Sequence, residues 1–567
     1  MIEYASDFET TTQAEDCRVW AWGCANVCVE PEPTFVSGTN IESWLAHVKA
    51  NPGRYWFHNL GFDSRFVMWH LLNSGCEWVE KKPVEGQFST VIDNMGKIYS
   101  LEIGNEGGKL VLADSFKKIP MSLASVAQAY DLPVTKGDLD YEAYREVGHE
   151  LTDEEKDYLS RDVLILARAM NKRLEVGTKL TTGADCLETY KDIIGKDLWN
   201  KWFPHLNPIL DGEIRQAYRG GYVYCNPLHQ GKVVGKGIAL DVNSLYPWVM
   251  RTALLPWGMP KRGRGKPKES KDFPLWVAEV QFDAVLKPGK LPCIQMKNNM
   301  FYRDREYIRE TIEPIDLWVS SVDWKLIYDM YDVTVYAWGA HYLFHGAEGM
   351  YNDYVDYWTA EKIAAGKEGN SARRQNAKLC LNNLYGKFGQ KVEVQGKVPV
   401  LDGDKVLHML PGDKGEREPV YIPSAVFITA WARNKTIRTA CEFGDRYLYS
   451  DTDSIKALGT DIPDDVHVDD YELGAWALEQ TFEKGIFLRA KTYATYSDGL
   501  CEYICAGMPN SLKEVMRFED FRVGFTTLGS DNPDYANTDN WKLVPHNVPG
   551  GCVLVPRPFT IHGSEGR

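Results

Sequence analysis

The 567-residue sequence predicts a multidomain α/β protein. With 44% hydrophobic residues, a chain of this length can bury a large core and divide into several domains. Over the first 180 or so residues, short strand-like runs alternate with helical segments, which is the pattern of an α/β unit. We find no signal peptide and no apolar run near the roughly 18 residues of a membrane span, so we expect no membrane anchor.

The charge balance limits the kinds of partner. The chain has 64 Lys and Arg against 79 Asp and Glu, a net charge of −15. Residues 1–180 hold much of this excess, with 18 basic and 28 acidic side chains. Any nucleic-acid channel must therefore be a local basic stripe. The 12 cysteines lack zinc-ribbon or thioredoxin-type spacing, and we expect reduced thiols.

Local patterns mark the elements in chain order. In LTDEEKDYLSRDVLILARAMNKRLE, Thr152 is predicted to cap a helix, with Glu155 as its capping-box partner. The segment PKRGRGKPKESK at 260–271 has six basic residues and little that can pack, so we expect an exposed insertion. Residues 391–418 alternate Val with polar residues around DG and PGD turns, which predicts a protruding β-hairpin. VPGGCVLVPRPFTIH predicts a second, smaller hairpin.

The segment YSDTDS at 449–454 is predicted to be a strand, a tight turn and a strand. Side chains alternate along a strand, so we expect Asp451 and Asp453 to point the same way. Taken alone, the motif also fits an ordinary Asp- and Ser-rich turn. GIALDVNSLYP adds Asp241 at a strand end, with Pro247 suited to the first turn of the next helix. Three clustered carboxylates repel one another without cations, which predicts a site for two divalent metal ions.

The segment SARRQNAKLCLNNLYGKFGQ at 371–390 predicts a helix with two different faces. Its polar stripe consists of Arg374, Lys378, Asn382 and Tyr385. The adjacent apolar stripe consists of Ala377, Leu381, Leu384 and Phe388. A basic stripe also fits an ordinary solvated face. Because this one ends in Tyr385, it offers cations for phosphates and a flat surface for a base pair, as a nucleoside triphosphate requires.

A second set of acids lies in the first 180 residues. Asp7 and Glu9 share one strand face in SDFETTT, Asp63 ends FHNLGFD, and Tyr158 and Asp162 are one helical turn apart in YLSRD. Each acid alone fits a capping or surface carboxylate. Together, four acids and a tyrosine predict a second two-metal site, which hydrolyses a phosphodiester.

The motifs, in this order, resemble those of a known family. DFETT, HNLGFD and YLSRD resemble the three exonuclease motifs of family B DNA polymerases, and DVNSLYP, KLCLNNLYGKF and YSDTDS resemble their three polymerase motifs. YRGGY at 218–222, KTY at 491–493 and two insertions between the polymerase motifs narrow the resemblance to the protein-primed branch of small tailed bacteriophages. PVYIPSAVFITAWAR and VPGGCVLV are also similar to that branch. The resemblance spans nearly the whole chain.

The resemblance implies an RNase H-like 3′–5′ exonuclease domain at 1–180 and a right-hand polymerase domain at 181–567. The palm is expected at about 181–259, 348–360 and 419–490, the fingers at about 361–390 and the thumb at about 520–567. The first insertion is expected at about 260–347 and the second, the β-hairpin, at about 391–418. In the family the second insertion closes a ring around DNA.

The resemblance also implies roles for single residues of the polymerase domain. Asp241 and Asp453 would bind two Mg²⁺ (or Mn²⁺) ions, with Asp451 in support. Tyr246 would exclude a ribose 2′-hydroxyl, although an ordinary core tyrosine also fits. Nucleotide contacts are implied for Arg374, Lys378, Asn382 and Tyr385. DNA contacts are implied for Lys491, Tyr493 and the loop Tyr218, Arg219, Gly220 and Gly221, whose glycines also fit a plain turn.

In the exonuclease domain, the resemblance assigns the metal ions, two per active site, to the four acids. These are Asp7, Glu9, Asp63 and Asp162. Tyr158 matches a water-orienting tyrosine. Thr10, Asn59 and Phe62 match single-strand contacts, and Lys136 assists them.

We therefore predict a processive, strand-displacing, protein-primed DNA polymerase with a 3′–5′ proofreading exonuclease. Its expected partners are primer-template DNA, deoxynucleoside triphosphates and a terminal protein primer, and we expect a monomer in the cytoplasm of an infected bacterial host. One alternative is a non-catalytic DNA-binding replication scaffold, whose acids are structural and need no divalent metal. Another is a nuclease with a degenerate polymerase half, but every polymerase acid is present.

Overall fold

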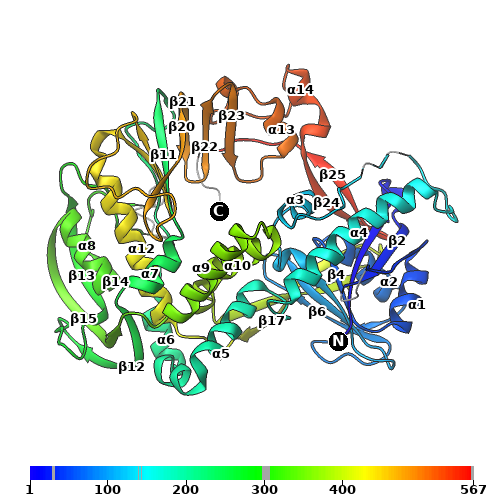
Figure 1. The fold of residues 1–567 in the computed structure, drawn as a ribbon, viewed down its shortest axis with the longest axis horizontal. Helices are drawn as coiled ribbons and strands as arrows, with labels where there is room; N and C mark the ends of the chain where they lie inside the picture. Colours follow the sequence, from blue (N-terminus) through cyan, green and yellow to red (C-terminus); the bar gives the residue numbers. More distant parts are fainter. Residues whose placement is uncertain (28–31, 138, 142, 297–306, 564–567) are drawn as a thin grey trace.

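A computed structural model describes residues 1–27, 32–137, 139–141, 143–296 and 307–563. Figure 1 shows residues 1–180 as one body and most of the remaining chain as a second, while β24 and β25 near the C-terminus lie against the first body. Residues 297–306 of the expected first insertion lie outside the described residues. No helix of the described ranges has both the length and the apolar character needed to cross a bilayer.

The first body is an α/β unit, which confirms the prediction. Its strands pair in the order β3-β2-β1-β4-β8-β7-β6-β5. They are β1 (Glu3–Thr10), β2 (Val19–Asn26), β3 (Phe35–Gly38), β4 (Arg54–Phe57), β5 (Glu77–Trp78), β6 (Gln87–Ile92), β7 (Ile98–Ile103) and β8 (Leu110–Asp114). The helices are α1 (Ile41–Ala50), α2 (Asp63–Asn73), α3 (Leu123–Ala129) and α4 (Asp153–Leu174).

The two faces of this sheet carry different helices. Phe8 of β1 packs with α1 and α2, whereas Ala5 packs with Leu159 of α4. Because side chains alternate along a strand, Asp7 and Glu9 share the face of Ala5 and are directed toward α4. The predicted capping box holds the start of α4, since the Thr152 hydroxyl accepts from the Glu155 N–H at 3.1 Å and the Glu155 carboxylate accepts from the Thr152 N–H at 3.1 Å.

Two antiparallel sheets and a long buried helix make up the expected palm and the residues after it up to Cys505, which the expected palm, fingers and thumb did not include. One sheet has the order β20-β11-β19-β18-β9 and the other β10-β21-β22-β23. The strands are β9 (Val223–Cys225), β10 (Val233–Val234), β11 (Gly237–Val242), β18 (Tyr447–Asp451), β19 (Ser454–Leu458), β20 (Trp476–Phe482), β21 (Lys484–Arg489), β22 (Thr492–Ser497) and β23 (Leu500–Cys505). The helices are α5 (Thr182–Trp202), α6 (Pro208–Arg215), α7 (Leu245–Thr252) and α12 (Ile422–Glu442).

The expected fingers are an antiparallel helix pair, α9 (Asn352–Lys367) and α10 (Ser371–Asn383), followed by the short α11 (Tyr385–Phe388). Helix α9 is continuous across the expected palm–fingers boundary at 360. The single helix predicted over 371–390 is wrong in one respect, because α10 ends before Leu384 and Tyr385 begins α11. The two stripes are confirmed: Arg374, Lys378 and Asn382 are exposed, whereas Ala377 and Leu381 are buried.

The first insertion forms a sheet of its own, in the order β12-β15-β13-β14. Its elements are β12 (Leu255–Arg264), β13 (Leu275–Leu286), β14 (Ile315–Ser320), α8 (Ser321–Met330) and β15 (Tyr331–Ala347). The second insertion is the predicted hairpin, β16 (Glu393–Leu401) and β17 (Leu407–Glu416). The C-terminal region contains α13 (Asn510–Val515), α14 (Pro533–Ala536) and the predicted small hairpin, β24 (Lys542–Val548) and β25 (Gly551–Arg557).

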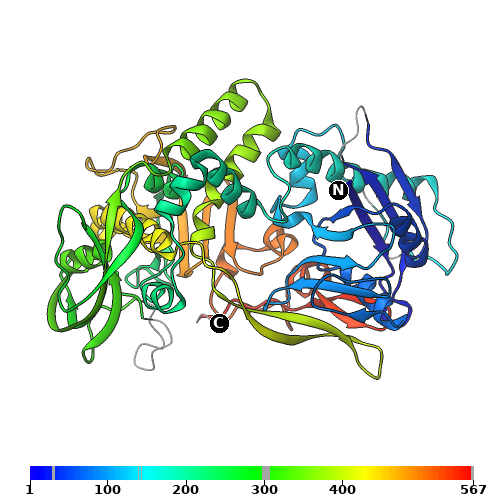
Figure 2. The ribbon, with the colours of Figure 1, turned by 90° about the horizontal axis from the view of Figure 1, so that it is seen from below.

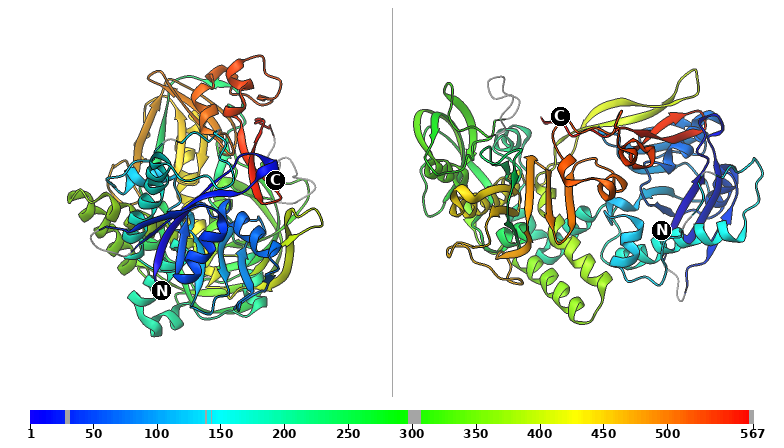
Figure 3. Two further views of the ribbon diagram at one scale, coloured as in Figure 1. Left: turned by 90° about the vertical axis from the view of Figure 1, so that its right-hand side faces the viewer. Right: turned by 90° about the horizontal axis from the view of Figure 1, so that it is seen from above.

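The second insertion reaches from the palm to the first body. Figure 2 shows it running beneath the first sheet, where β16 contacts β6, and Figure 3 shows β24 and β25 beside it. Leu407 of the hairpin and Cys552 of β25 are buried in the same apolar cluster as Phe66 of α2. The Trp69 indole donates to the carbonyl of Lys405 at 2.7 Å. Three segments far apart in the chain therefore share one core.

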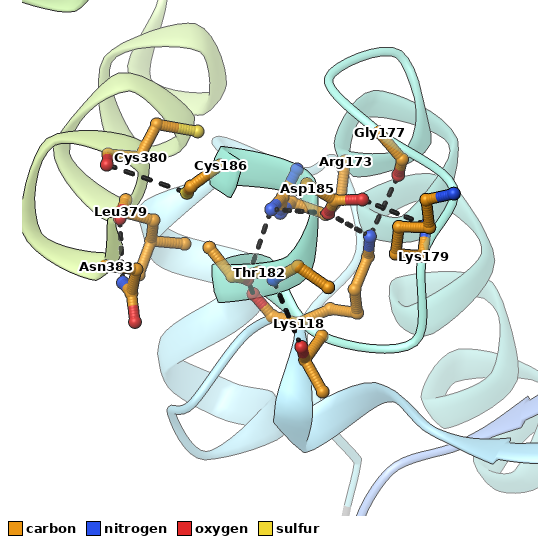
Figure 4. Close-up of polar contacts among 12 residues, drawn as sticks. Lys118, Arg173, Gly177, Lys179, Thr182, Asp185, Cys186, Leu379, Cys380 and Asn383 are labelled. Atoms are coloured by element: carbon orange, nitrogen blue, oxygen red, sulfur yellow. Dashed lines mark hydrogen bonds and ion pairs between the residues drawn. The ribbon is translucent and has the colours of Figure 1, made fainter. Parts of the chain in front are cut away.

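A buried ion cluster fixes the first body against α5 (Figure 4). The Lys118 ammonium and the Arg173 guanidinium both bind the carboxylate of Asp185, with Arg173 Nη2 at 3.1 Å. All three side chains are fully buried. Burial, with Arg173 nearby, lowers the pKa of Lys118 to about 8, although Asp185 opposes this. Removing one partner of such a cluster typically costs about 3–5 kcal/mol, so the cluster contributes to holding the first body against α5.

Candidate active sites

Three aspartates meet at one end of the palm sheet. Asp241 is the last but one residue of β11 and lies in register with Ser454 of β19. The Val242 N–H donates to the carbonyl of Asp453 at 2.8 Å, and the Asp453 N–H to that of Asp451 at 2.7 Å. The prediction that strand alternation aligns Asp451 with Asp453 is wrong, because Asp453 lies in the turn after Thr452, whose φ is 59°. The turn between β18 and β19 and the pairing register of β11 with β19 bring the three aspartates together instead.

The surroundings of these aspartates disfavour negative charge. Burial raises the pKa of Asp241 to about 7, and the charges of Asp453 and Glu479 add to this shift. Burial also raises the pKa of Asp453, to which Asp451 and Glu479 contribute. Glu479, on β20, was not predicted as a site residue. No sequence motif includes Glu479. The irregular pairing of β20 with β11 brings it near Asp241.

Asp451 already has a cationic partner. Lys491 Nζ lies 2.8 Å from its carboxylate, and the Lys491 N–H donates to the Tyr449 hydroxyl at 2.8 Å. Tyr493 is 9% exposed and packs 5.1 Å from Tyr449, centroid to centroid. The predicted primer-end residues Lys491 and Tyr493 therefore lie against β18 and the Asp451 at its end.

The predicted sugar and base residues lie face to face. The rings of Tyr246 on α7 and Tyr385 on α11 stack with centroids 3.8 Å apart and planes 22° apart. Lys378 lies near enough to Asp241 for its charge to lower the pKa of that carboxyl. Lys362 of α9 was not predicted; burial and then the charges of Arg374 and Lys378 lower its pKa. Helices α9 and α10 therefore present one cationic cluster.

The backbone of the loop 218–221 lies against Thr452, in the turn between β18 and β19. A Cβ on Gly221 would lie 2.6 Å from Thr452 Oγ1, which explains glycine there. The Arg433 guanidinium donates to the carbonyls of Arg219 and Gly220 at 2.7 and 2.8 Å. The Arg219 guanidinium donates to the carbonyl of Trp318 at 2.9 Å, so it faces the first insertion. Tyr218 lies beside Gly389: a Cβ added to this glycine would lie 2.5 Å from the Tyr218 hydroxyl.

The second acidic cluster joins β1, α2 and α4. Burial raises the pKa of Asp7 to about 7, and the charge of Asp162 adds to the shift. Burial raises the pKa values of Glu9 and Asp63 well above their ordinary values, and Asp7 adds to both shifts. Lys136 Nζ lies 3.4 Å from Asp162. The charge of Lys136 therefore opposes the raised pKa values of three of these acids, Asp7, Glu9 and Asp162.

Both clusters have the donor chemistry of a divalent cation site. Carboxylate oxygens suit Mg²⁺ and Mn²⁺. Asp162 Oδ1 is buried and has no hydrogen-bond partner within the described residues, so it can accept a cation. Over the same ranges, no group of three His, Cys, Asp or Glu side chains is already arranged around a common point. The two clusters therefore fit metal ions because they offer oxygen ligands and because a cation would offset the charge of their buried carboxylates.

Two tyrosines lie beside these acids. Tyr158 donates to Asp162 Oδ2 at 3.5 Å, and its hydroxyl is also hydrogen-bonded to that of Tyr141. Tyr141, which is 49% exposed, was not predicted, although it ends the segment KGDLDY that begins with Lys136. It lines a small cavity together with Thr10.

The segment before α2 holds the two other predicted single-strand contacts. Asn59 has a φ of 70°, and its N–H donates to the Asp114 carboxylate at 3.1 Å. The ring of Phe62 lies 5.5 Å from that of Phe66, centroid to centroid. This packing holds the loop at the start of α2, where Asp63 begins the helix.

Comparison with known proteins agrees with these motifs. The family model for DNA polymerase type B, organellar and viral, matches residues 45–149 and 144–470. The chain is 37% identical to the DNA polymerase of Bacillus phage M2, over 98% of this chain and 99% of that protein. It is 38% identical to that of Bacillus phage phi29, over 98% of both chains. The structure of phi29 DNA polymerase with primer-template DNA and incoming nucleotide substrates matches with a TM-score of 0.91, over 99% of this chain and 100% of that one.

Proposed function

Because this chain belongs to the protein-primed branch of the type B DNA polymerases, we propose that its two carboxylate clusters are the polymerase and 3′–5′ exonuclease active sites. The observation that carries the proposal is the convergence of Asp241, Asp451 and Asp453 at the end of one sheet. The second cluster lies on β1, α2 and α4 of the first body, so synthesis and degradation would use separate sets of side chains. The expected domain boundaries are part of this proposal.

In the polymerase site, Asp241 and Asp453 would hold Mg²⁺ or Mn²⁺, whose charge activates a 3′-hydroxyl and stabilises the leaving pyrophosphate. Asp451 supports them from its ion pair with Lys491. Lys378 and Arg374 contact the triphosphate, while Tyr385 and Asn382 line the new base pair. Lys491 and Tyr493 hold the primer end, and the loop 218–221 holds DNA for synthesis.

In the exonuclease site, the same type of ion would be held by Asp7, Glu9, Asp63 and Asp162. Tyr158 orients the attacking water, and its hydrogen bond to Asp162 fixes the direction of its hydroxyl. Lys136 offsets the charge of the acids from 3.4 Å. Thr10, Asn59 and Phe62 hold the single-stranded 3′ end.

The partners follow from the same relatives. The phi29 polymerase structure contains primer-template DNA and incoming nucleotides, and we assign both kinds of partner to this chain. We also assign it a terminal protein as primer, a monomeric state and a place in the cytoplasm of an infected host cell. The hairpin of the second insertion, the first body and β24–β25 share one core, so they close a ring through which template DNA passes.

The direct test is extension of a primed single-stranded circle, with and without Mg²⁺. We expect long, template-dependent products with the metal and none without it. A non-catalytic scaffold would bind the circle equally in both conditions and extend neither. Products that do not depend on the template sequence would contradict the proposal.

Sugar selection should depend on Tyr246. Its ring stacks on Tyr385 at 3.8 Å, which fixes its position, and a ring held under the sugar would leave no room for a 2′-hydroxyl. Tyr246→Val should raise ribonucleotide incorporation by about tenfold or more, since one steric contact in a pocket is worth about 1–3 kcal/mol. Deoxynucleotide use should change little. Competitive single-nucleotide incorporation measures both, and Tyr246→Phe is the matched control.

A purely structural tyrosine would give a different result. In that case Tyr246→Val would lower the melting temperature while the preference for deoxynucleotides stayed the same.

A further inference from the structure

The exposed basic segment at 260–271 has no part in either active site. Six of the 64 Lys and Arg residues of this acidic chain fall within its 12 positions. We call these six residues the basic ridge; they are Lys261, Arg262, Arg264, Lys266, Lys268 and Lys271, and all are exposed. The ridge begins on β12, an edge strand that pairs with β15 alone.

Most of this charge is not neutralised by the protein. Arg264, Lys266, Lys268 and Lys271 form no ion pair or side-chain hydrogen bond with any residue in the described ranges. Arg262 lies 3.5 Å from Glu213. The acid within the segment, Glu269, binds Lys325 at 3.1 Å and accepts from the Trp276 indole at 3.1 Å, so it is occupied elsewhere.

The loop that follows β12 and carries the rest of the ridge is held at both ends. His341 Nδ1 donates to the carbonyl of Gly265 and His345 Nδ1 to that of Asp272, each at 2.8 Å. Pro267 is buried in the middle of the loop. The loop carrying the cations is therefore already ordered, and binding a ligand would cost little further backbone entropy.

An aromatic stack lies under the ridge. His345 lies between Trp257 and Phe273, with ring centroids 4.7 and 4.4 Å apart. Lys201 Nζ lies 5.4 Å from the Trp257 ring, and Lys261 Nζ lies 5.9 Å from the Phe273 ring. Because cations already cover the ends of the stack, this surface offers charge to phosphates and no ring face to a base. Binding there would be independent of sequence.

We propose that the basic ridge binds the phosphate backbone of single-stranded DNA outside the two active sites. Neighbouring residues of a strand point to opposite faces, so Lys261 and Arg262 place charge on both sides of the edge. Duplex DNA has a persistence length of about 150 base pairs, so it cannot bend around the edge of a sheet and would contact only one side. A flexible single strand can bend around the edge and contact both sides. This proposal depends on the proposed function in one point only, which is that the protein works on DNA.

An ordinary role for such charges is to keep edge strands from pairing with one another. The test therefore compares two variants with the same change in net charge. The ridge variant replaces Arg264, Lys266, Lys268 and Lys271 by Gln. The control replaces four exposed lysines elsewhere, Lys81, Lys82, Lys109 and Lys236, by Gln. Binding of an oligothymidylate is measured by fluorescence anisotropy in EDTA over a range of NaCl concentrations.

The slope of log affinity against log salt should fall by roughly 3 in the ridge variant, at about 0.7 for each lost phosphate contact. The control should keep the wild-type slope. Both variants should fill a short gap at the wild-type rate, because the ridge lies outside the active sites. If the wild type itself filled no gap, the proposed function would fail, and the binding result would still decide this inference.

Three results would overturn the inference. They are an unchanged slope in the ridge variant, an equal loss of slope with duplex DNA of the same length, and slowed gap filling in the ridge variant alone. An unchanged slope together with self-association in sedimentation would show that the charges keep edge strands apart. An unchanged slope together with lost binding of polyglutamate would identify an acidic protein as the partner instead.

Discussion

Replacing Asp453 by alanine should abolish nucleotide addition and leave degradation of single-stranded DNA intact. The Asp453 backbone is fixed to Asp451 and Val242 by hydrogen bonds of 2.7 and 2.8 Å, so its carboxylate has a defined place beside Asp241. Loss of the charge stabilisation that this carboxylate positions should cost several kcal/mol, which is about a thousandfold or more in rate. Single-nucleotide extension of a labelled primer measures the loss.

The reciprocal variant is the matched control. Asp63→Ala should stop degradation and leave primer extension intact, because α2 and the palm sheet belong to different bodies. Asp453→Asn keeps the volume of the side chain and should be nearly as defective as alanine, which separates charge from folding. Extension by Asp453→Ala at the wild-type rate would show that the polymerase site is assigned wrongly.

Features fixed by a few consecutive residues could be predicted from the sequence. The capping box at Thr152, the hairpin at 391–418 and the stripes of α10 each depend on local spacing, and the structure confirms them. The two acidic sets could be recognised because their motifs are short and occur in a fixed order. What local spacing cannot show is how a turn re-aims the side chain of Asp453.

The remaining features depend on contacts between distant segments. Glu479 reaches Asp241 through a register shift between β11 and β20 at Ala239 and Leu240, which no pattern within either strand encodes. The partners Lys118 and Asp185 are 67 residues apart and belong to different bodies. The Arg219 guanidinium turns to Trp318 of the first insertion, 99 residues away, so its basic character alone did not reveal its contacts.

Replacing Gln395 to Arg417 by a short Gly-Ser linker should end processive, strand-displacing synthesis while short-gap filling survives. The removed hairpin supplies the buried Leu407 and the Lys405 carbonyl that accepts from Trp69, so its loss opens the ring between the palm and the first body. A closed ring keeps DNA at high local concentration between additions. Its loss should shorten products by about 10²-fold when trap DNA captures every released enzyme.

A milder variant separates ring opening from damage to the exonuclease core. Asn547 of β24 donates to the Leu407 carbonyl at 2.6 Å and accepts from the Arg65 guanidinium, so it links the hairpin, the thumb region and α2. Asn547→Ala removes these bonds and keeps the apolar contacts, and it should shorten products in the presence of the trap to a smaller extent than the deletion.

The decisive comparison is synthesis through several kilobases of duplex, because the proposed template tunnel would be too narrow for duplex and would force the strands apart as the enzyme advances. An exposed hairpin without function would tolerate removal, as many loop tips do. Full-length products from the deletion variant in the presence of the trap would exclude the ring as the cause of processivity. Shortened products from a variant that still degrades single-stranded DNA normally would establish that the ring, and not the stability of the first body, sets product length.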